Sequence, residues 1–380
     1  MNFKSFSFHP NINVGISKAG YDTPTSIQTQ TIPAILSGKD VLGLAQTGTG
    51  KTAAFVLPIL ERLMKGPRGK IRALILAPTR ELAEQTNQAI KQLGSQTGIR
   101  SMSIYGGVSA SSQIRALRNG VDIVVACPGR LLDLKDQRVI QLSNIEVLVM
   151  DEADHMFDMG FLPSIRKIIA LLPKNRQTLL FSATMPLEIR KLANEILHNP
   201  ETVEIGISKP VKGISHVFYP VDQSRKLETL FQLLRESEEG QVLVFTRTKH
   251  RAKSLAFQLS KAGLSTTSLQ GNLSQSKRDV AMDLFRRGRV KIMVATDIAA
   301  RGIDVSRVSH VINYDIPDTV DAYTHRTGRT GRMERLGTAL SLVTRDDFQM
   351  VRSIERQTGQ VFERREVKDL PNSKKSYQSS

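Results

Sequence analysis

Short apolar runs alternate with amphipathic segments of helical length along the chain, and this alternation restricts the fold more than any other feature. The runs of the first half are DVLGLA, RALILA, VDIVVA, IEVLVM and QTLLFSA, at residues 40–45, 72–77, 121–126, 145–150 and 177–183. Their apolar residues occupy both odd and even positions, as expected for parallel strands that are covered on both faces. A segment of helical period follows, such as RELAEQTNQAIKQL at 80–93. The pattern predicts an α/β fold.

A stretch of linker composition, GISKPVKGISH at 206–216, interrupts the alternation. The apolar runs then restart as HVFYPV, QVLVFT, VKIMVAT and VSHVINY, at residues 216–221, 241–246, 290–296 and 308–314. We therefore expect two tandem domains, each with a mostly parallel sheet flanked by helices. The predicted division is a first domain at 1–205, a linker at 206–215, a second domain at 216–362 and a polar, disordered tail at 363–380.

The chain is strongly basic, with 53 Lys and Arg against 36 Asp and Glu and a formal charge of +17. Residues 208–380 carry a net +11, and the polar tail adds little to it. Such a balance indicates a polyanionic partner, although a solvated lysine-rich surface is the alternative. The length of 380 residues and 40% hydrophobic residues are enough for real cores, which excludes disorder throughout.

Cysteine content and hydropathy restrict the compartment. Cys127 is the only cysteine, which excludes an intramolecular disulfide framework and a cysteine-built zinc site. No apolar run approaches the roughly 20 residues of a membrane helix, and the N-terminus MNFKSFSFHP lacks the apolar core of a signal peptide. We expect a soluble protein of the cytoplasm that has no membrane partner.

The segment AQTGTGKT at 45–52 follows the first apolar run and precedes a helical segment, as a phosphate-binding loop does. Backbone N–H groups of such a loop cradle phosphate oxygens, Lys51 would reach the outer phosphates, and the Thr52 hydroxyl would hold Mg²⁺. The loop residues that would bind the nucleotide are Thr47, Gly48, Thr49, Gly50, Lys51 and Thr52. Ala45 replaces the first Gly of the generic pattern, so a glycine-rich turn without a ligand stays open as the alternative.

A pair of carboxylates, Asp151 and Glu152, ends the apolar run of VLVMDEAD. Open α/β sheets bind ligands at the carboxyl ends of their strands. There Asp151 could orient Mg²⁺ and its waters, and Glu152 could act as general base on the attacking water. Solvated or helix-capping acids are the alternative for this segment.

The order and spacing of the motifs resemble those of DEAD-box ATP-dependent RNA helicases of superfamily 2, and the compact body most resembles bacterial RhlE-type members. The resemblance covers nearly the whole chain and implies two tandem RecA-like domains that use ATP and Mg²⁺. The motifs are GYDTPTSIQ (20–28), AQTGTGKT (45–52), PTREL (78–82), GG (106–107), PGR (128–130), DEAD (151–154), SAT (182–184), VFTRT (244–248), QSKR (275–278), ATDIAARGID (295–304) and HRTGRTGR (325–332).

The resemblance also implies roles in nucleotide binding and hydrolysis. Gln28 would read adenine, because a carboxamide matches its N6 amino group and N7, and Phe3 would stack on the base. Taken alone, Gln28 would rather be a helix-start residue after Pro24, and Phe3 a surface aromatic that holds the N-terminus. In the second domain, Arg329 and Arg332 would stabilise the charge that develops on the transferred phosphoryl group, and His325 would contact the acidic motif. Asp304 would bind the ribose hydroxyls, and Arg301 would help to position the catalytic residues.

The implied RNA contacts are made to phosphates and sugars, so binding should be independent of sequence and sensitive to salt. They map to Thr79, Arg80, Gly107, Arg130, Arg247, Thr248, Thr296 and Asp297, and coupling of hydrolysis to strand separation maps to Ser182, Thr184, Gln275 and Arg278. An N-terminal helix cap is the alternative for Ser182 and Thr184. Cys127 stands where the family usually has Thr and reads as a small buried strand residue. His155 is expected to be a helix-surface residue.

We therefore expect an RNA-stimulated ATPase that closes on single-stranded RNA or a short duplex and separates it locally, or remodels RNA–protein complexes. The alternatives are an ATP-gated RNA clamp or annealing scaffold, and a DNA helicase. We further expect a monomer, with ribosome-assembly or RNA-decay proteins as possible partners.

Overall fold

A computed structural model describes residues 2–46, 48–205, 214–237, 240–297, 308–330 and 337–366, with only the backbone of Gln275 and Asp321. The chain divides into two compact units, Met1–Ser208 and Lys209–Ser380. The division lies within the predicted linker 206–215, of which residues 206–213 are outside the described ranges. Within those ranges, no helix combines the length and apolarity that a membrane span needs.

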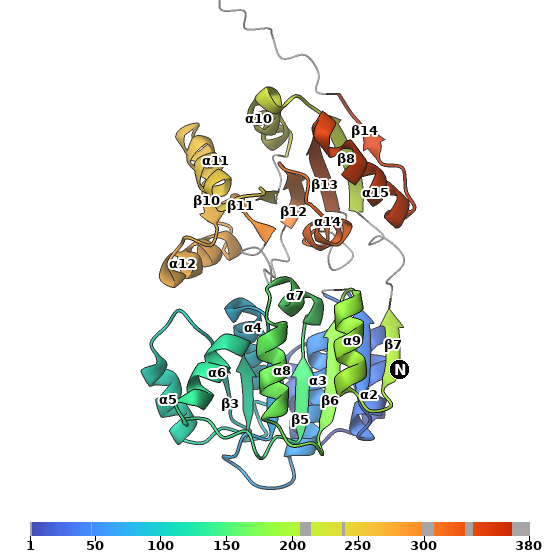
Figure 1. Ribbon diagram of the computed structural model, residues 1–380, viewed down its shortest axis with the longest axis vertical. Helices are drawn as coiled ribbons and strands as arrows, with labels where there is room; N and C mark the ends of the chain where they lie inside the picture. Colours follow the sequence, from blue (N-terminus) through green and yellow to red (C-terminus); the bar gives the residue numbers. More distant parts are fainter. Residues whose placement is uncertain are drawn as a thin grey trace, which may run out of the picture. The chain divides into compact units, whose positions relative to one another are not determined.

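The first unit is built on a seven-stranded sheet in the order β3-β4-β2-β5-β6-β1-β7 (Figure 1). Every described pairing between its neighbouring strands is parallel. The strands are β1 (Val41–Ala45), β2 (Ala73–Leu76), β3 (Ser101–Ile104), β4 (Ile123–Ala126), β5 (Val147–Met150), β6 (Gln177–Ser182) and β7 (Glu201–Ile205). The helices are the 3₁₀ turn η1 (Phe3–Phe6), α1 (Pro10–Lys18), α2 (Ser26–Leu36), α3 (Lys51–Leu63), α4 (Arg80–Leu93), α5 (Ala110–Arg118), α6 (Pro128–Asp136), α7 (Ala153–Asp158), α8 (Leu162–Ala170) and α9 (Leu187–Ile196).

The second unit repeats this plan in the order β10-β11-β9-β12-β13-β8-β14, again with parallel pairings throughout the described strands. The strands are β8 (Ile214–Pro220), β9 (Gln241–Phe245), β10 (Thr266–Leu269), β11 (Ile292–Ala295), β12 (Val308–Asn313), β13 (Gly337–Val343) and β14 (Glu363–Arg364). The helices are η2 (Gln223–Arg225), α10 (Lys226–Glu236), α11 (Lys249–Lys261), α12 (Gln275–Arg286), α14 (Val320–Thr327), η3 (Arg345–Asp347) and α15 (Phe348–Thr358). The predicted fold class, two α/β units with parallel sheets, is confirmed. Strand β14 pairs with β8 although the sequence had placed 363–364 in the tail.

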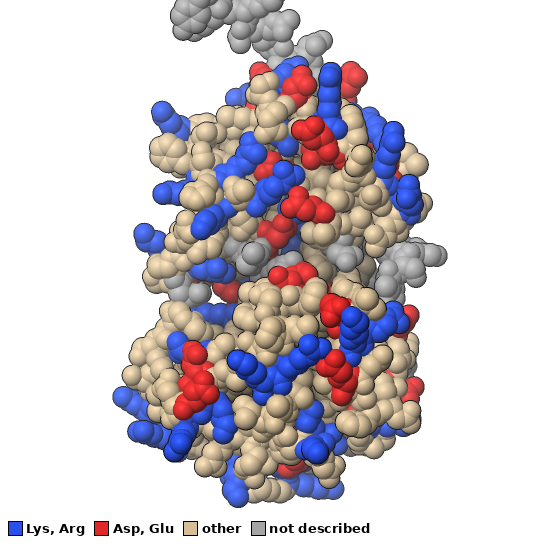
Figure 2. Space-filling view, in the orientation of Figure 1, with Lys and Arg blue, Asp and Glu red and all other residues tan. Residues whose placement is uncertain are grey.

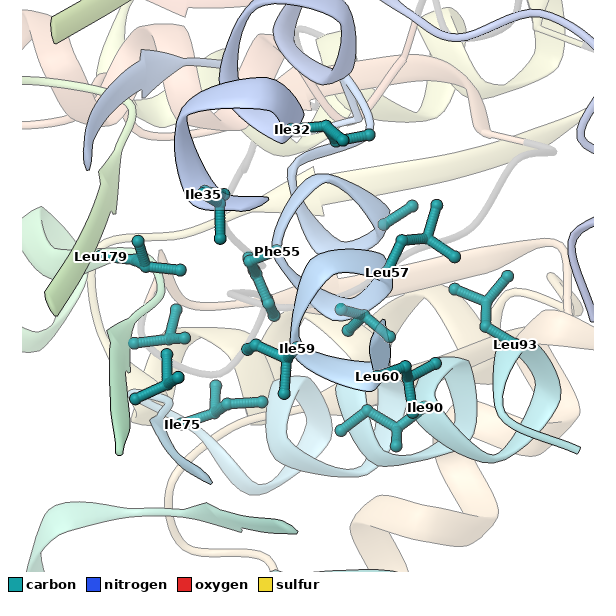
Figure 3. Packing of buried hydrophobic residues seen from close by; sticks show 14 of the residues in the cluster. Ile32, Ile35, Phe55, Leu57, Ile59, Leu60, Ile75, Ile90, Leu93 and Leu179 are labelled. Atoms are coloured by element: carbon teal, nitrogen blue, oxygen red, sulfur yellow. The ribbon is translucent and has the colours of Figure 1, made fainter. Parts of the chain in front are cut away.

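Both faces of each sheet are covered, which explains the apolar residues at both odd and even strand positions. In β2, Ala73 and Ile75 pack in one cluster and Leu74 and Leu76 in another. Figure 3 shows the first cluster, where side chains of α2, α3 and α4 meet Ile75 and Leu179 of the sheet. The opposite cluster is formed with α6, α8 and α9. The sheet is therefore a buried, rigid platform whose strand ends hold the loops in place.

Candidate ATP and RNA site

The motif loops of the first unit leave the same edge of the sheet, because each follows the carboxyl end of a parallel strand. The phosphate loop follows β1, the acidic motif follows β5, and the SAT motif ends β6, which pairs with both. The three adjacent strand ends thus bring together segments that are far apart in sequence. This is the edge at which open α/β sheets bind ligands.

The phosphate loop has the backbone that its glycines allow. Gly48 and Gly50 have φ angles of 87° and 95°, in the left-handed region that favours glycine. A Cβ at Gly50 would lie 2.5 Å from Nε2 of Gln28, so space as well as φ requires glycine there. Gly50 is the N-cap of α3, whose first N–H groups therefore open toward the loop. Thr47 lies outside the described residues, and Thr52 follows Lys51 in the first turn of α3.

Lys51 is buried, and its ammonium Nζ donates to the carbonyl oxygen of Ala45 at 2.6 Å. This bond fixes the Lys51 side chain against the end of β1, on the other side of the phosphate loop. An ammonium has three donors, so others stay available for a phosphate.

Gln28 links the motif at 20–28 to the phosphate loop. Its Oε1 accepts the backbone N–H of Thr25 at 2.9 Å, and its Nε2 donates to the carbonyl oxygen of Gly50 at 3.1 Å. The first bond belongs to a capping box at the start of α2, so the interpretation of Gln28 as a helix-start residue is confirmed. This role does not exclude a contact with adenine. The side chain keeps a second N–H and a second lone pair.

Phe3 is not a surface aromatic, because only 4% of it is exposed. Its ring is stacked on Tyr21 at 6.1 Å between centroids and meets the edge of Phe6 at the same distance. The cluster closes the N-terminal segment onto the first core. Stacking of Phe3 on adenine stays a prediction.

Asp151 follows the last residue of β5 and is buried, and its Oδ1 has no hydrogen-bond partner among the described residues. Burial raises the pKa of its carboxyl to about 7, although the nearby Lys51 ammonium opposes the rise. A buried carboxylate oxygen without a partner suits a divalent cation, because the cation would replace the missing hydrogen bonds. The donor set of Asp151 and the Thr52 hydroxyl is all oxygen, as Mg²⁺ prefers.

Glu152 has a left-handed backbone with φ of 53°, which is unusual for a residue other than glycine. It is the N-cap residue of α7, and its carboxylate Oε2 lies 2.9 Å from Nδ1 of His155. His155 is only 5% exposed, so the expected helix-surface position is wrong. The imidazole instead packs inward and holds the carboxylate that the sequence assigns as general base.

The SAT motif contacts the acidic motif directly. Both the N–H and the hydroxyl of Thr184 donate to Oδ2 of Asp154, and Oγ of Ser182 accepts the N–H of Asp154 at 3.2 Å. The N-cap of α9 is Pro186, so Ser182 and Thr184 do not cap that helix. The helix-cap alternative is therefore wrong.

The expected RNA-contact residues of the first unit also lie just beyond strand ends. Thr79 is the N-cap of α4, and the guanidinium of Arg80 lies 4.5 Å from the ring centroid of Tyr105. Gly107 has a positive φ of 79°. Arg130 donates to the carbonyl oxygen of Val108 at 3.2 and 3.3 Å and pairs with Asp133 at 3.6 Å. The contacts of Arg130 tie the PGR segment to the loop after Gly107.

Cys127 is the N-cap of α6, one residue beyond β4, and is half-buried. Its thiol makes no capping hydrogen bond. Burial, with a contribution from Glu81, raises the pKa of the thiol to about 12, so the thiolate form is suppressed. The expected strand position is off by one residue, and the expected burial is only partial.

In the second unit, Arg247 and Thr248 follow β9. Arg247 donates to the carbonyl oxygen of Ile316 at 3.2 Å and pairs with Asp318 at 3.3 Å, while Thr248 caps α11 by accepting the N–H of Arg251. Thr296 and Asp297 follow β11. Arg278 lies in the first turn of α12, which begins at Gln275.

Arg326 received no role from the sequence, yet it organises this end of the second unit. It is buried and binds both carboxylate oxygens of Asp297, at 2.5 and 2.7 Å. It also donates to Oδ1 of Asn313 and to the carbonyl oxygen of Asp315. Asp297 is thus engaged by the protein itself. The basic segment at 325–332 gave a signal for Arg326, but its partner could not be read from the sequence.

The remaining predicted residues are divided by the described ranges. His325 lies in α14, and its carbonyl oxygen accepts Nε of Arg329 at 3.2 Å. Arg301, Asp304 and Arg332 lie outside the described residues, as does the side chain of Gln275. Their predicted roles stay predictions.

Comparison with known proteins agrees with this arrangement. The family model for the DEAD/DEAH box helicase matches residues 25–192, and the helicase conserved C-terminal domain matches residues 225–334. The DEAD-box ATP-dependent RNA helicase CshA of Bacillus subtilis is 41% identical over 366 residues, which cover 96% of this chain and 74% of the relative. The RNA helicase CrhR of Synechocystis is 44% identical over 359 residues, with 94% and 72% covered.

Among solved structures, Saccharomyces cerevisiae Dbp5 bound to RNA and ADP BeF3 superposes with a TM-score of 0.88 at 32% identity. The match covers 96% of this chain and 95% of that one. Sequence, fold and site therefore agree, and the chain belongs to the DEAD-box family of ATP-dependent RNA helicases.

Proposed function

We propose that this protein hydrolyses ATP in response to RNA and uses the hydrolysis to separate short RNA duplexes or to remodel RNA–protein complexes. The observation that carries the proposal is the buried pair of Lys51 and Asp151 beside a glycine loop with two left-handed residues. A cationic donor, a carboxylate oxygen without a partner and open helix N–H groups together suit a nucleotide triphosphate with its metal.

The residues divide the work as follows. Lys51 and the N–H groups at the start of α3 would bind the outer phosphates, and Thr52 with Asp151 would hold Mg²⁺, which neutralises phosphate charge when it is bound. No group of three or more His, Cys, Asp or Glu side chains in the described ranges is placed to hold a metal, so water and phosphate would complete its coordination. Glu152, oriented by His155, would accept a proton from the attacking water.

Adenine recognition would rest on Gln28. Its second N–H and second lone pair match adenine, while its other two bonds fix the carboxamide against Thr25 and Gly50. Because guanine presents the reversed pattern, GTP should support hydrolysis much less well than ATP. Equal rates with the two nucleotides would remove this role from Gln28.

RNA binding would use Thr79, Arg80, Gly107, Arg130, Arg247 and Thr248, most of which lie at strand ends or helix starts. Such contacts favour the backbone of the nucleic acid over its bases. Since hydrolysis would also require Arg329 of the second unit, we propose that RNA and ATP each tighten binding of the other. The RhlE-type subgroup, the monomeric state and the cytoplasmic location stay predictions of the sequence.

The test is phosphate release with and without single-stranded RNA. We expect strong stimulation by RNA and, in Glu152→Gln, a rate at least about 100-fold lower. Glu188→Gln is a matched control, because Glu188 is a glutamate of the same unit that pairs only with Lys191 among the contacts described. Wild-type turnover in Glu152→Gln would contradict the chemistry. ATP-dependent RNA binding without turnover would favour a clamp, and equal stimulation by DNA would favour a DNA helicase.

A further inference from the structure

The second unit contains a long stretch without acidic residues. Residues 240–278 include seven Lys and Arg residues and no Asp or Glu. The stretch forms β9, α11 and β10 and enters α12. Figure 2 shows Lys and Arg side chains gathered over α11. Arg247 and Arg251 of this stretch pair with Asp318 and Asp315, which lie outside it, whereas no described ion pair includes the lysines of α11. These lysines can therefore attract a polyanion.

The outer face of α11 carries a regular row of side chains, the α11 row, made of Lys249, Lys253, Phe257 and Lys261. All four are exposed and follow one another at intervals of four residues, so they lie on one side of the helix. At 1.5 Å per residue the row is about 18 Å long. Its inner side, with Leu255 and Leu259, packs in the core, so the row is held on a rigid element.

Two features of the α11 row are costly for folding alone. Phe257 is 68% exposed although a phenyl ring is better buried. Lys249 and Lys253 repel one another at an interval of four residues, and no described ion pair includes Lys249, Lys253 or Lys261. A partner that brings negative charge to the lysines and a flat ring to Phe257 would offset both. Single-stranded nucleic acid supplies both, because phosphates alternate with bases that stack on aromatic rings.

The position of the α11 row also fits such a partner. Thr248, an expected RNA contact, is the N-cap of α11, so the row leads away from that contact along the same helix. We propose that the α11 row is an additional RNA-binding surface, on which Lys253 and Lys261 contact phosphates and Phe257 stacks on an unpaired base. The proposal rests on the RNA binding proposed above and extends it to single-stranded RNA that passes beyond the motif residues.

The test measures binding of a single-stranded RNA to the full chain at several salt concentrations without nucleotide. The double variant Lys253→Gln/Lys261→Gln should bind more weakly and lower the slope of log affinity against log salt by about 0.7 for each lysine that neutralises a phosphate. Phe257→Ala should weaken binding about fivefold or more. An RNA of the same length with abasic sites should bind the wild type more weakly, and Phe257→Ala should bind both RNAs more nearly equally.

Helix α15 of the same unit provides the matched control. Phe348, Arg352 and Arg356 are exposed and have the same four-residue spacing, but Asp346, Asp347 and Glu355 lie beside them in sequence. Phe348→Ala and Arg352→Gln/Arg356→Gln should leave affinity and salt slope near wild type. Equal losses in the α15 variants would overturn the proposal, because total charge would then explain the effect.

The proposal and the proposed function fail in different ways. The α11 variants should keep the wild-type ATPase rate at saturating RNA while they need more RNA to reach it. Unchanged affinity and slope in both α11 variants would overturn the α11 row, even if the wild type is an RNA-stimulated ATPase. Loss of phosphate contacts without any difference between intact and abasic RNA would also overturn it, since an acidic protein would then suit the lysines equally well.

Discussion

Thr184 donates both its backbone N–H and its hydroxyl to Oδ2 of Asp154, each at 2.9 Å. The two residues lie 30 positions apart and meet because β6 is paired with β5 in the sheet. A displacement of Asp154 during hydrolysis would therefore move the SAT segment directly through these hydrogen bonds. This link gives a physical basis for the predicted coupling role of Ser182 and Thr184.

Replacement of the Thr184 hydroxyl should separate ATP hydrolysis from strand separation. Thr184→Ala removes one of the two bonds to Asp154 and leaves the N–H bond, a loss of about 1 kcal/mol. We expect the RNA-stimulated ATPase rate to stay within about twofold of wild type and duplex separation to fall several-fold, and Thr184→Ser to restore both. Equal loss of the two activities in Thr184→Ala would mean that the contact is only structural.

Asp151 should destabilise the nucleotide-free protein as the pH rises. The pKa of its carboxyl is raised to about 7, so the folded state keeps a proton that the unfolded state releases near pH 4. The penalty therefore grows as the pH rises from about 4 and is complete above about pH 7. Asp151→Asn should therefore increase the free energy of unfolding more at pH 8 than at pH 5, by about 2 kcal/mol.

Urea unfolding followed by circular dichroism would check this, since the chain has no Trp. Asp122→Asn is the matched control, because Asp122 is equally buried but accepts the N–H groups of Gly69 and Arg100. That variant should be less stable than wild type at both pH values. If Asp151→Asn shows the same change in stability at pH 5 and pH 8, the Asp151 carboxylate does not carry the charge penalty.

His216 should make the second unit sensitive to acid. Burial lowers the pKa of its imidazole to about 4, and its ring stacks on Phe362 at 4.6 Å between centroids. The imidazole binds a proton near pH 6.5 in the unfolded state but only near pH 4 in the folded state. The free energy of unfolding therefore decreases as the pH falls from 6.5 toward 4.

About 2 kcal/mol of unfolding free energy should be lost between pH 7 and pH 5 through this one group. His216→Phe should remove that part of the loss at the expense of the hydrogen bond to the Tyr323 hydroxyl. His250→Gln, at an exposed histidine of the same unit, should keep the acid sensitivity of the wild type. Identical pH profiles for His216→Phe and wild type would contradict the assignment.

The sequence predicted most of the interior strands, because both of their faces are buried. The run at 177–183 corresponds to β6 at Gln177–Ser182, for example. The apolar runs of the sequence missed the buried interior strand β13, and they also missed β3, β7, β10 and β14, which are edge strands with few buried side chains. Such strands are specified by pairing with a neighbour, and a run of apolar residues is not needed for that.

The sequence predicted those parts of the candidate site that are formed by residues adjacent in sequence. It did not predict contacts between residues that only the fold brings together. The positions of the phosphate loop and of Asp151 follow from their place after apolar runs. The inward turn of His155 onto Glu152 depends on the left-handed backbone of Glu152, which the sequence does not show. The pairing of Asp297 with Arg326 joins residues 29 positions apart and changes what Asp297 is expected to do.

Asp297 should act on RNA through the fold of the second unit and not through a direct contact. Both of its oxygens bind the buried guanidinium of Arg326, which would be left without a counter-charge in Asp297→Asn. Because Asp297 itself is partly exposed, we expect a loss of about 2 kcal/mol in unfolding free energy, below the usual cost of breaking a buried pair. Asp283→Asn breaks the exposed pair with Arg287 and should cost less than about 0.5 kcal/mol. Unchanged stability in Asp297→Asn together with weaker RNA binding would instead favour a direct contact.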